Sequence, residues 1–167
     1  MEKEVYKGNI LRVTEEVIDD ITWEKVHLPS GVIVFPVTDQ GKIILIRERR
    51  PHENPPVRIK PVSGILEEKL GSPEENAQRE MQEEIGFRAR EMKLLMTLQS
   101  TGTVTHVQHF FVARGLEVSK LPNPDGEEVI EALIEYTPDE LRMALKNDQI
   151  KWSMSTLGMF RLLDSMS

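Results

Sequence analysis

Cysteine is absent from the 167 residues of this chain. The absence excludes disulfide bonds, zinc sites built on thiolates and cysteine nucleophiles. It suits a reducing compartment, so we expect a cytoplasmic protein. No window approaches the roughly 18 apolar residues that a membrane span requires. The first ten residues, MEKEVYKGNI, also lack the basic start and apolar stretch of a signal peptide.

Positive charge is scarcer than negative charge. The chain has 21 lysines and arginines against 28 aspartates and glutamates, which gives a formal net charge of −7 and a pI near 5.2. Such a chain repels a nucleic-acid backbone, so we expect no nucleic-acid or membrane partner, and a small anionic ligand would need local positive charge. The length and a hydrophobic content of 39% are sufficient for one domain with a real core.

Hydrophobic periodicity predicts strands in the first part of the chain. Residues 1–28 alternate apolar and charged side chains, which predicts a short N-terminal β segment. Residues 31–37 and 42–49 are β-branched runs on either side of a turn, which predicts a hairpin. Four prolines within residues 51–63 predict a surface loop without regular structure.

The second part of the chain adds further strands and helices. Strand-like runs occupy residues 92–99, 104–113 and 127–136, and helices are expected over residues 137–148, with Thr137 as N-cap, and 154–166. Strands and helices do not alternate regularly, so we expect an α+β fold with a mixed sheet. We divide the chain into the N-terminal β segment, which is a possible dimerisation element, and one domain over residues 29–167.

The clearest helix signals stand near the middle of the chain. Ser72 and Glu75 form a capping box with Pro73 at the first helical position. These signals predict a helix over residues 73–85, which Gly86 ends. The apolar residues that recur every four positions, and so predict the face packed on a sheet, are Ala77, Met81 and Ile85.

Three glutamates, Glu80, Glu83 and Glu84, lie together on a neighbouring face of this helix, although like charges three and four positions apart repel. Arg79 lies four residues before Glu83 and can brace one carboxylate. A run of glutamates is commonly just a solvated helix face. The alternative is a bound hard cation, Mg²⁺ or Mn²⁺, which prefers oxygen ligands.

The sequence REMQEEIGF, residues 79–87, resembles the second half of the Nudix hydrolase box, R-E-apolar-x-E-E-x-G-apolar. The matching positions are Arg79, Glu80, Met81, Glu83, Glu84, Gly86 and Phe87. The resemblance implies an α/β/α sandwich with a mixed sheet, in which helix carboxylates hold divalent cations against a diphosphate. The family thereby offers a way to offset the repulsion between the three glutamates.

The first half of the box departs from the family pattern. Gly71 stands where the family has a glutamate, and the distance from Gly64 to Arg79 is one residue longer than usual. Either Glu67 or Glu68 substitutes, or the position is lost. In the family that glutamate mainly braces the arginine and the loop.

Outside the box, most of residues 30–165 resembles ADP-ribose pyrophosphatases and nucleoside-diphosphate-sugar hydrolases. That branch has a hairpin leading to R-x-x-R, here Arg47 and Arg50, and Lys60 reverses the charge of a glutamate at a substrate-side position. The candidate substrate-binding residues are Arg47, Arg50, Arg58 and Lys60, together with Trp23, which either stacks on a nucleobase or is packed or buried in a dimer.

The resemblance also implies roles at the site. We expect Glu80 and Glu84 to be the principal metal ligands, and the Gly64 carbonyl to add a further ligand. Glu83 is expected to support a second cation or to polarise water. Besides Glu83 and Glu84, we expect Arg79 to act in catalysis. In related enzymes a glutamate of the late acidic loop can act as general base, and Glu127 or Glu128 matches its position here.

The implied reaction is Mg²⁺-dependent hydrolysis of ADP-ribose or a nucleoside diphosphate sugar, which gives a nucleoside monophosphate and a sugar phosphate. One alternative is hydrolysis of another nucleoside diphosphate linked to X, such as a dinucleoside polyphosphate or a nucleoside triphosphate. The other is a non-catalytic module that binds a nucleotide. The branch often forms homodimers, so we expect a homodimer.

Overall fold

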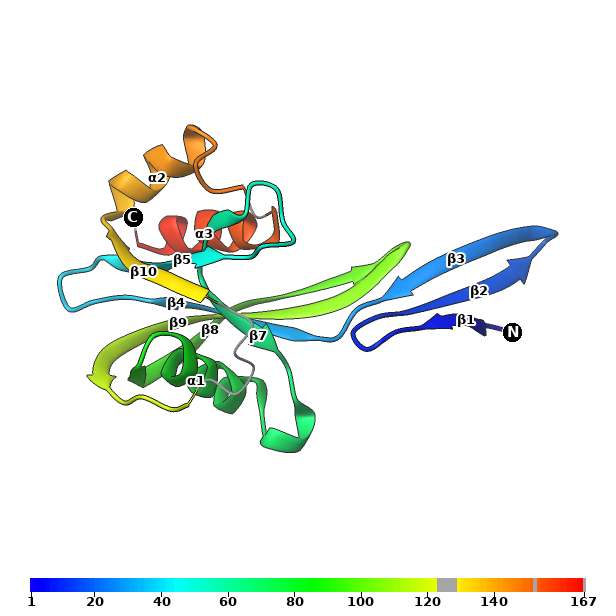
Figure 1. Cartoon of the computed structure of the whole chain (residues 1–167), viewed down its shortest axis with the longest axis horizontal. Helices are drawn as coiled ribbons and strands as arrows, with labels where there is room; N and C mark the ends of the chain where they lie inside the picture. The colour runs from blue at the N-terminus through cyan, green and yellow to red at the C-terminus, as the bar shows by residue number, and fades with distance from the viewer. Residues whose placement is uncertain (123–128, 152, 167) are drawn as a thin grey trace.

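The structure, a computed structural model, describes residues 1–122, 129–151 and 153–166 (Figure 1). Its strands are β1 (Lys3–Lys7), β2 (Arg12–Ile18), β3 (Ile21–His27), β4 (Gly31–Pro36), β5 (Ile43–Arg49), β6 (Val57–Lys60), β7 (Val62–Ile65), β8 (Phe87–Thr101), β9 (Val104–Val118) and β10 (Val129–Tyr136). Its helices are α1 (Pro73–Glu84), α2 (Pro138–Lys146) and α3 (Ser153–Ser165), and a 3₁₀ turn covers Glu68–Leu70.

The larger of two sheets is mixed. Its strand order is β1-β2-β3-β9-β4-β7, and β8 pairs with β9. Strand β9 runs antiparallel to β8 and parallel to both β3 and β4. The smaller sheet has the order β10-β5-β6. Figure 1 shows α1 on one side of the large sheet and α2 and α3 on the other. This arrangement confirms the predicted α+β fold, with a mixed sheet between helices.

Strand β4 supplies side chains to two separate cores. Successive side chains of a strand point to opposite faces of the sheet. Ile33 and Phe35 pack in the core beneath α2 and α3, whereas Val32 and Val34 pack against α1. Every residue of β4 is therefore buried, which explains why its sequence is a continuous apolar run rather than an alternating one.

The predicted hairpin of residues 31–37 and 42–49 is only partly correct. Both runs are strands, and a turn joins them, but the isolated bridge Val37–Ile43 is what links them. Beyond that bridge β4 enters the large sheet, whereas β5 pairs with β6 and β10. The two runs enter different sheets because each pairs with strands that lie far away in the sequence. A local sequence pattern does not reveal such pairing.

The proline-rich segment is not entirely a loop, contrary to the expectation for residues 51–63. Pro55 and Pro56 precede β6, which pairs with β5. Pro61 stands between β6 and β7, where the chain passes from the small sheet to the large one. Proline has no N–H to donate to a ladder, so these positions outside the strands tolerate it.

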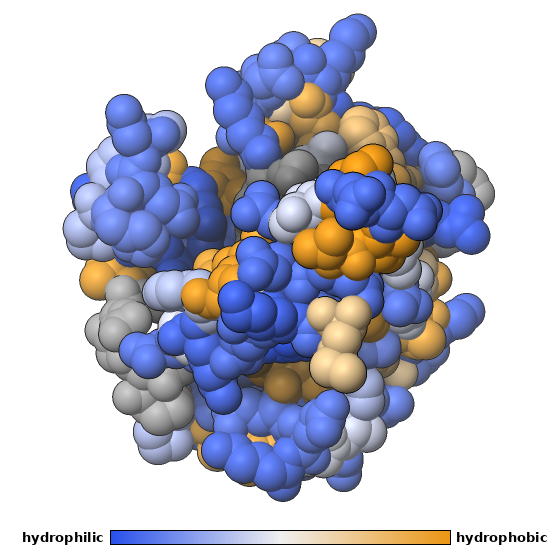
Figure 2. Space-filling view, turned by 90° about the vertical axis from the view of Figure 1, so that its right-hand side faces the viewer, coloured by the Kyte–Doolittle hydropathy of each residue, from blue (hydrophilic) through white to orange (hydrophobic). Residues whose placement is uncertain are grey.

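Strands β1 to β3 form an antiparallel arm that projects from the rest of the molecule (Figure 1). The arm joins the body where β3 pairs with β9 at Val26 and His27. Thr14 is buried within it, but β1 is exposed along its whole length. Figure 2 looks at this end of the molecule, where hydrophobic patches lie among charged side chains. The predicted N-terminal β segment is confirmed as strands.

The helices follow their predicted signals. Thr137 caps α2, since its hydroxyl accepts a hydrogen bond from the Glu140 N–H and Pro138 takes the first position. Helix α3 packs Met159 and Leu162 into the core beneath it. In the described part of the chain, each helix is too short or too polar to cross a bilayer.

Candidate active site

Helix α1 begins and ends where its sequence signals place it. The Ser72 Oγ accepts a hydrogen bond from the Glu75 N–H at 3.2 Å, and the Glu75 carboxylate accepts one from the Ser72 N–H at 2.7 Å. The hydrogen bond from the Ser72 backbone lowers the pKa of the Glu75 carboxyl. Ile85 closes the helix, and Gly86 follows with a φ of 75°. The capping box and the predicted helix are confirmed.

The apolar face of α1 fixes the direction of its glutamates. Ala77 and Met81 are fully buried against the large sheet, and Ile85 is nearly so. This packing turns the neighbouring face of α1 toward β7, where Gly64 and Ser63 lie. The helix and the glycine turn thus meet as the resemblance implied.

Glu67 contacts the arginine of the box. The Arg79 Nη1 lies 3.4 Å from the Glu67 Oε1, and the Arg79 Nη2 donates to the Asn76 Oδ1 at 2.9 Å. Hydrogen bonds from Lys69 and then from Arg79 hold the pKa of Glu67 below its ordinary value. Of the two candidates to replace the glutamate lost at Gly71, the structure therefore brings Glu67 to Arg79.

Asn76 holds this loop on the helix, and the sequence reasoning missed it. Its side chain is fully buried and accepts a hydrogen bond from the Glu67 N–H at 3.1 Å. Its amide group donates to the carbonyls of Gly71 and Ser72 at 3.2 Å and 3.0 Å. The sequence feature that could have pointed to Asn76 is its place directly before Ala77, which lies on the buried face of the helix.

Glu80 lies directly against Gly64. A Cβ placed on Gly64 would stand 2.2 to 2.5 Å from the carboxyl atoms of Glu80, so only glycine leaves this carboxylate its place. The Arg79 Nη2 is 3.9 Å from the Glu80 Oε1. The structure thus brings together three of the expected residues, namely Gly64, Arg79 and Glu80.

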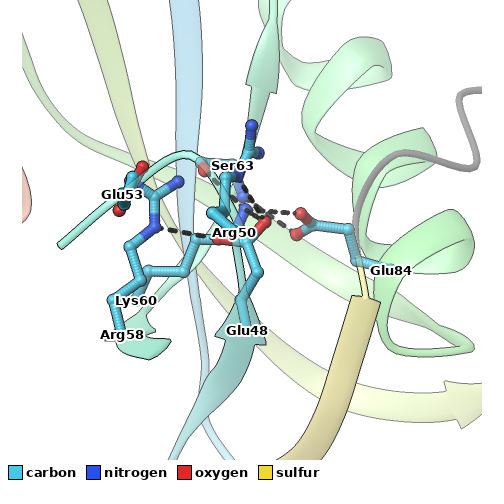
Figure 3. A network of polar contacts seen from close by, with 7 residues as sticks. All are labelled: Glu48, Arg50, Glu53, Arg58, Lys60, Ser63 and Glu84. Carbon is cyan, nitrogen blue, oxygen red and sulfur yellow. Dashed lines mark hydrogen bonds and ion pairs between the residues drawn. The ribbon is translucent and has the colours of Figure 1, made fainter. Parts of the chain in front are cut away.

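Glu84 faces a lysine. The Lys60 Nζ donates to the Glu84 Oε1 at 2.7 Å, and the Ser63 N–H donates to the Glu84 Oε2 at 3.1 Å (Figure 3). Both side chains are buried, with exposed fractions of 1% for Lys60 and 2% for Glu84. This burial argues against the expected contact of Lys60 with a sugar or phosphate, because its ammonium points inward.

The Lys60–Glu84 pair belongs to a larger group that we call the buried ion cluster. Its members among the described residues are Glu48, Arg50, Glu53, Arg58, Lys60 and Glu84 (Figure 3). Glu48 is fully buried at its centre, and accepts hydrogen bonds from the Nε of Arg50 at 3.0 Å and of Arg58 at 2.9 Å. Burial alone would raise the pKa of Glu48, but Lys60 and Arg58 outweigh it and hold that pKa below its ordinary value.

The expected substrate residues are spread over several elements. Arg47 lies half exposed on β5, and its Nε is 3.2 Å from a carboxylate oxygen of Glu131 on β10. Arg50 and Arg58 belong to the buried ion cluster. Trp23 is 55% exposed on β3, in the arm that extends away from α1 (Figure 1). Glu127 and Glu128 lie outside the described residues, so their roles stay predictions.

A family model for the NUDIX domain matches residues 27–156. The match covers most of the chain, which therefore belongs to the Nudix family. It is a Nudix hydrolase of the ADP-ribose pyrophosphatase-like branch, as the resemblance of residues 79–87 to the box and of residues 30–165 to that branch implied. Nudix hydrolases generally use divalent metal ions.

Two characterised relatives are similar to this chain. The methanol dehydrogenase activator of Bacillus methanolicus is 30% identical over 168 residues, which cover 93% of this chain and 86% of the relative. The ADP-ribose pyrophosphatase of Bacillus subtilis (strain 168) is 35% identical over 123 residues, which cover 72% of this chain and 65% of the relative. Among solved structures, the crystal structure of an ADP compounds hydrolase matches with a TM-score of 0.82 and 18% identity, over 99% of this chain and 91% of that one. This last match shows the shared fold.

The two expected principal ligands are placed differently. The Glu80 carboxylate lies against the Gly64 turn, in the space that a Cβ on Gly64 would occupy, so these two expected oxygen ligands lie together. Both oxygens of Glu84 meet donors instead, from Lys60 and the Ser63 N–H. Over residues 1–122, 129–151 and 153–166, no three histidine, cysteine, aspartate or glutamate side chains are grouped so as to hold a metal ion.

Proposed function

We propose that this chain hydrolyses the pyrophosphate bond of ADP-ribose or of a nucleoside diphosphate sugar, with Mg²⁺ or Mn²⁺ as cofactor. The observation that carries the proposal is the seating of the Glu80 carboxylate against Gly64 on a capped Nudix helix. The similarity to an ADP-ribose pyrophosphatase supports the substrate class. The absence of cysteine supports a cytoplasmic location.

Each part of the site has a role in this proposal. Glu80, Glu83 and the Gly64 carbonyl would hold the cation, while the Glu67–Arg79 contact keeps the turn before α1 in place. A bound divalent cation would neutralise the diphosphate and activate a water molecule for attack on phosphorus. The general base would be Glu127 or Glu128.

The charged residues of β5 and β6 would orient the diphosphate. Arg47 has an exposed guanidinium, and Arg50 and Arg58 are about one-quarter exposed. A guanidinium can bind phosphate oxygens in a bidentate manner. We assign the phosphate contacts to Arg47 and Arg50, and a contact with the terminal sugar phosphate to Arg58.

We also propose that the protein is a homodimer that associates through the arm. Ile18 and Ile21 stand opposite each other in the β2–β3 pair, as do Glu16 and Trp23, so that Ile18, Ile21 and Trp23 share one face. These three apolar side chains are each about half exposed. A second copy would cover them and would bring Trp23 to the nucleobase of the partner's site.

A second candidate function is activation of a dehydrogenase. The similarity to the methanol dehydrogenase activator favours it, because that similarity extends over 93% of this chain. In this case nucleotide binding or hydrolysis would regulate a partner enzyme. Addition of the chain to a purified methanol dehydrogenase tests this candidate, with a rise in alcohol oxidation as the expected result.

The proposed hydrolysis is tested on a substrate panel of ADP-ribose, nucleotide sugars, diadenosine polyphosphates and nucleoside triphosphates. Each is incubated with Mg²⁺, Mn²⁺ or a chelator. We expect metal-dependent cleavage of one sugar-linked class, abolished by Glu80→Gln. The matched control is Glu74→Gln, which removes an exposed carboxylate from the same helix. Binding of a nucleotide without turnover would contradict the proposal and favour a non-catalytic module.

A further inference from the structure

The Lys60 ammonium lies between two buried carboxylates. Its Nζ is 2.7 Å from the Glu84 Oε1 and 3.7 Å from the Glu48 Oε1, and it donates to the Ser63 Oγ at 3.2 Å. The side chain is 1% exposed. Strand β6 holds its backbone in register with β5, opposite Ile46. Lys60 is therefore a fixed charge of the site rather than a mobile surface lysine.

The Lys60–Glu84 pair lies in the most buried part of the cluster, where the two side chains are 1% and 2% exposed. Charges in such a desolvated place interact strongly, so a further positive charge beside Lys60 is unfavourable. A divalent cation on Glu84 would lie beside the Lys60 ammonium, which already donates to the Glu84 Oε1 at 2.7 Å.

We propose that Lys60 makes Glu84 a positioning residue, so that divalent-cation binding on α1 depends on Glu80 and not on Glu84. This inference rests on the proposed function, since it concerns the cation of the same site. Glu84 then links α1 to β6 through Lys60 and to β7 through the Ser63 N–H. Lys60 compensates the negative charge of Glu84, so α1 presents less negative charge to a cation. The Lys60 ammonium thereby takes the place that a metal ion would otherwise have beside Glu84.

The test is the binding of Mn²⁺ alone, measured by electron paramagnetic resonance on the full chain without substrate. The pair variant Lys60→Met/Glu84→Gln removes both charges together and avoids an unpaired buried ion. We expect this variant to bind Mn²⁺ about as tightly as the wild type. We expect Glu80→Gln to weaken Mn²⁺ binding about tenfold or more, because even groups behind the ligands contribute that much.

The single variant Lys60→Met tests the blocking role of the lysine. It releases the Glu84 carboxylate, so we expect tighter Mn²⁺ binding or a further bound equivalent. A thermal melt of each variant shows whether it is folded, and the pair variant keeps the test valid if Lys60→Met unfolds. Loss of Mn²⁺ binding in the pair variant, to the level of Glu80→Gln, would overturn the inference. Unchanged binding in a folded Lys60→Met variant, or no Mn²⁺ binding by the wild type, would do so as well.

Failure of this inference is distinguishable from failure of the proposed function. Turnover on the substrate panel, together with Mn²⁺ loss in the pair variant, contradicts the role of Lys60 alone. Intact Mn²⁺ binding in the pair variant, without turnover of any substrate by the wild type, contradicts the hydrolysis and leaves the role of Lys60 standing.

Discussion

At the scale of the residue, the contact between Gly64 and Glu80 shows how the lack of one side chain determines the arrangement of the site. Gly64 has no side chain, and the Glu80 carboxylate takes the space that a Cβ would occupy. The backbone of Gly64 does not have a positive φ, so its conformation alone does not require glycine. The requirement is close approach, and it links the glycine of the turn to a carboxylate sixteen residues later.

The variant Gly64→Ala tests this close approach. We expect kcat/KM to fall by up to about 100-fold, because misplacement of a catalytic group by about 1 Å has this effect. Stability should change little, since the group that must move is the end of a flexible side chain. Hydrolysis assays and thermal unfolding measure the two quantities. Gly102→Ala is the matched control, because its Cβ would meet no atom within 4 Å.

Sequence reasoning at this scale reached some contacts and missed others. The resemblance to the family box led us to expect Glu80 and Gly64 at the same site. It did not distinguish Glu67 from Glu68, because which of them reaches Arg79 depends on how the turn before α1 runs. The Lys60–Glu84 contact joins residues on different elements, so spacing along the chain does not reveal it. Glu48 was missed although a lone carboxylate between Arg47 and Arg49, at the end of the apolar run of β5, was a visible signal.

Elements differ in how far local sequence determines them. Helix α1 was predicted to within one residue, because its capping box and its glycine stop are local interactions. Strands β4 and β5 were identified as strands, but their separation into two sheets was not. Strand pairing depends on residues that are distant in the sequence, such as β10 beside β5.

The docking of α3 depends on Gly158. A Cβ at this position would stand 2.5 Å from the Phe110 ring and 2.9 Å from the Phe35 ring, both of which are fully buried. We expect Gly158→Ala to lower the free energy of unfolding, because overpacking costs about 1 to 3 kcal/mol and the gain in helix propensity is at most about 1 kcal/mol.

Urea denaturation of Gly158→Ala measures this loss. The control Leu157→Ala changes a side chain of the same helix that is 48% exposed, and should have a smaller effect. A Gly158→Ala variant as stable as the wild type would show that α3 can move outward without loss.

The whole molecule consists of a body and an arm with little core of its own. The arm contacts the body through a short parallel pairing of β3 with β9. A small sheet is stabilised when its hydrophobic face is packed, and several apolar side chains of this arm are exposed. In the proposed dimer a second copy would cover them.

The double variant Ile21→Lys/Trp23→Lys tests association through the arm. We expect it to shift the protein from dimer to monomer, because an unpaired charge buried in an apolar interface costs about 3 kcal/mol or more. Light scattering after size-exclusion chromatography measures the mass. Thr22→Lys, on the opposite face of β3, is the control and should leave the dimer intact. A wild type that is monomeric at all concentrations would exclude this mode of assembly.

Strand β4 acts as a partition between two halves of the interior. Ile33 and Phe35 pack beneath α2 and α3, and Val32 and Val34 pack against α1. Strand β9 divides its side chains in the same way, with Phe110 on one side and Phe111 on the other, so a substitution behind α2 or α3 reaches α1 through the backbones of the central strands. The packing around α1, which carries Glu80, can therefore be kept while side chains behind α2 and α3 are replaced.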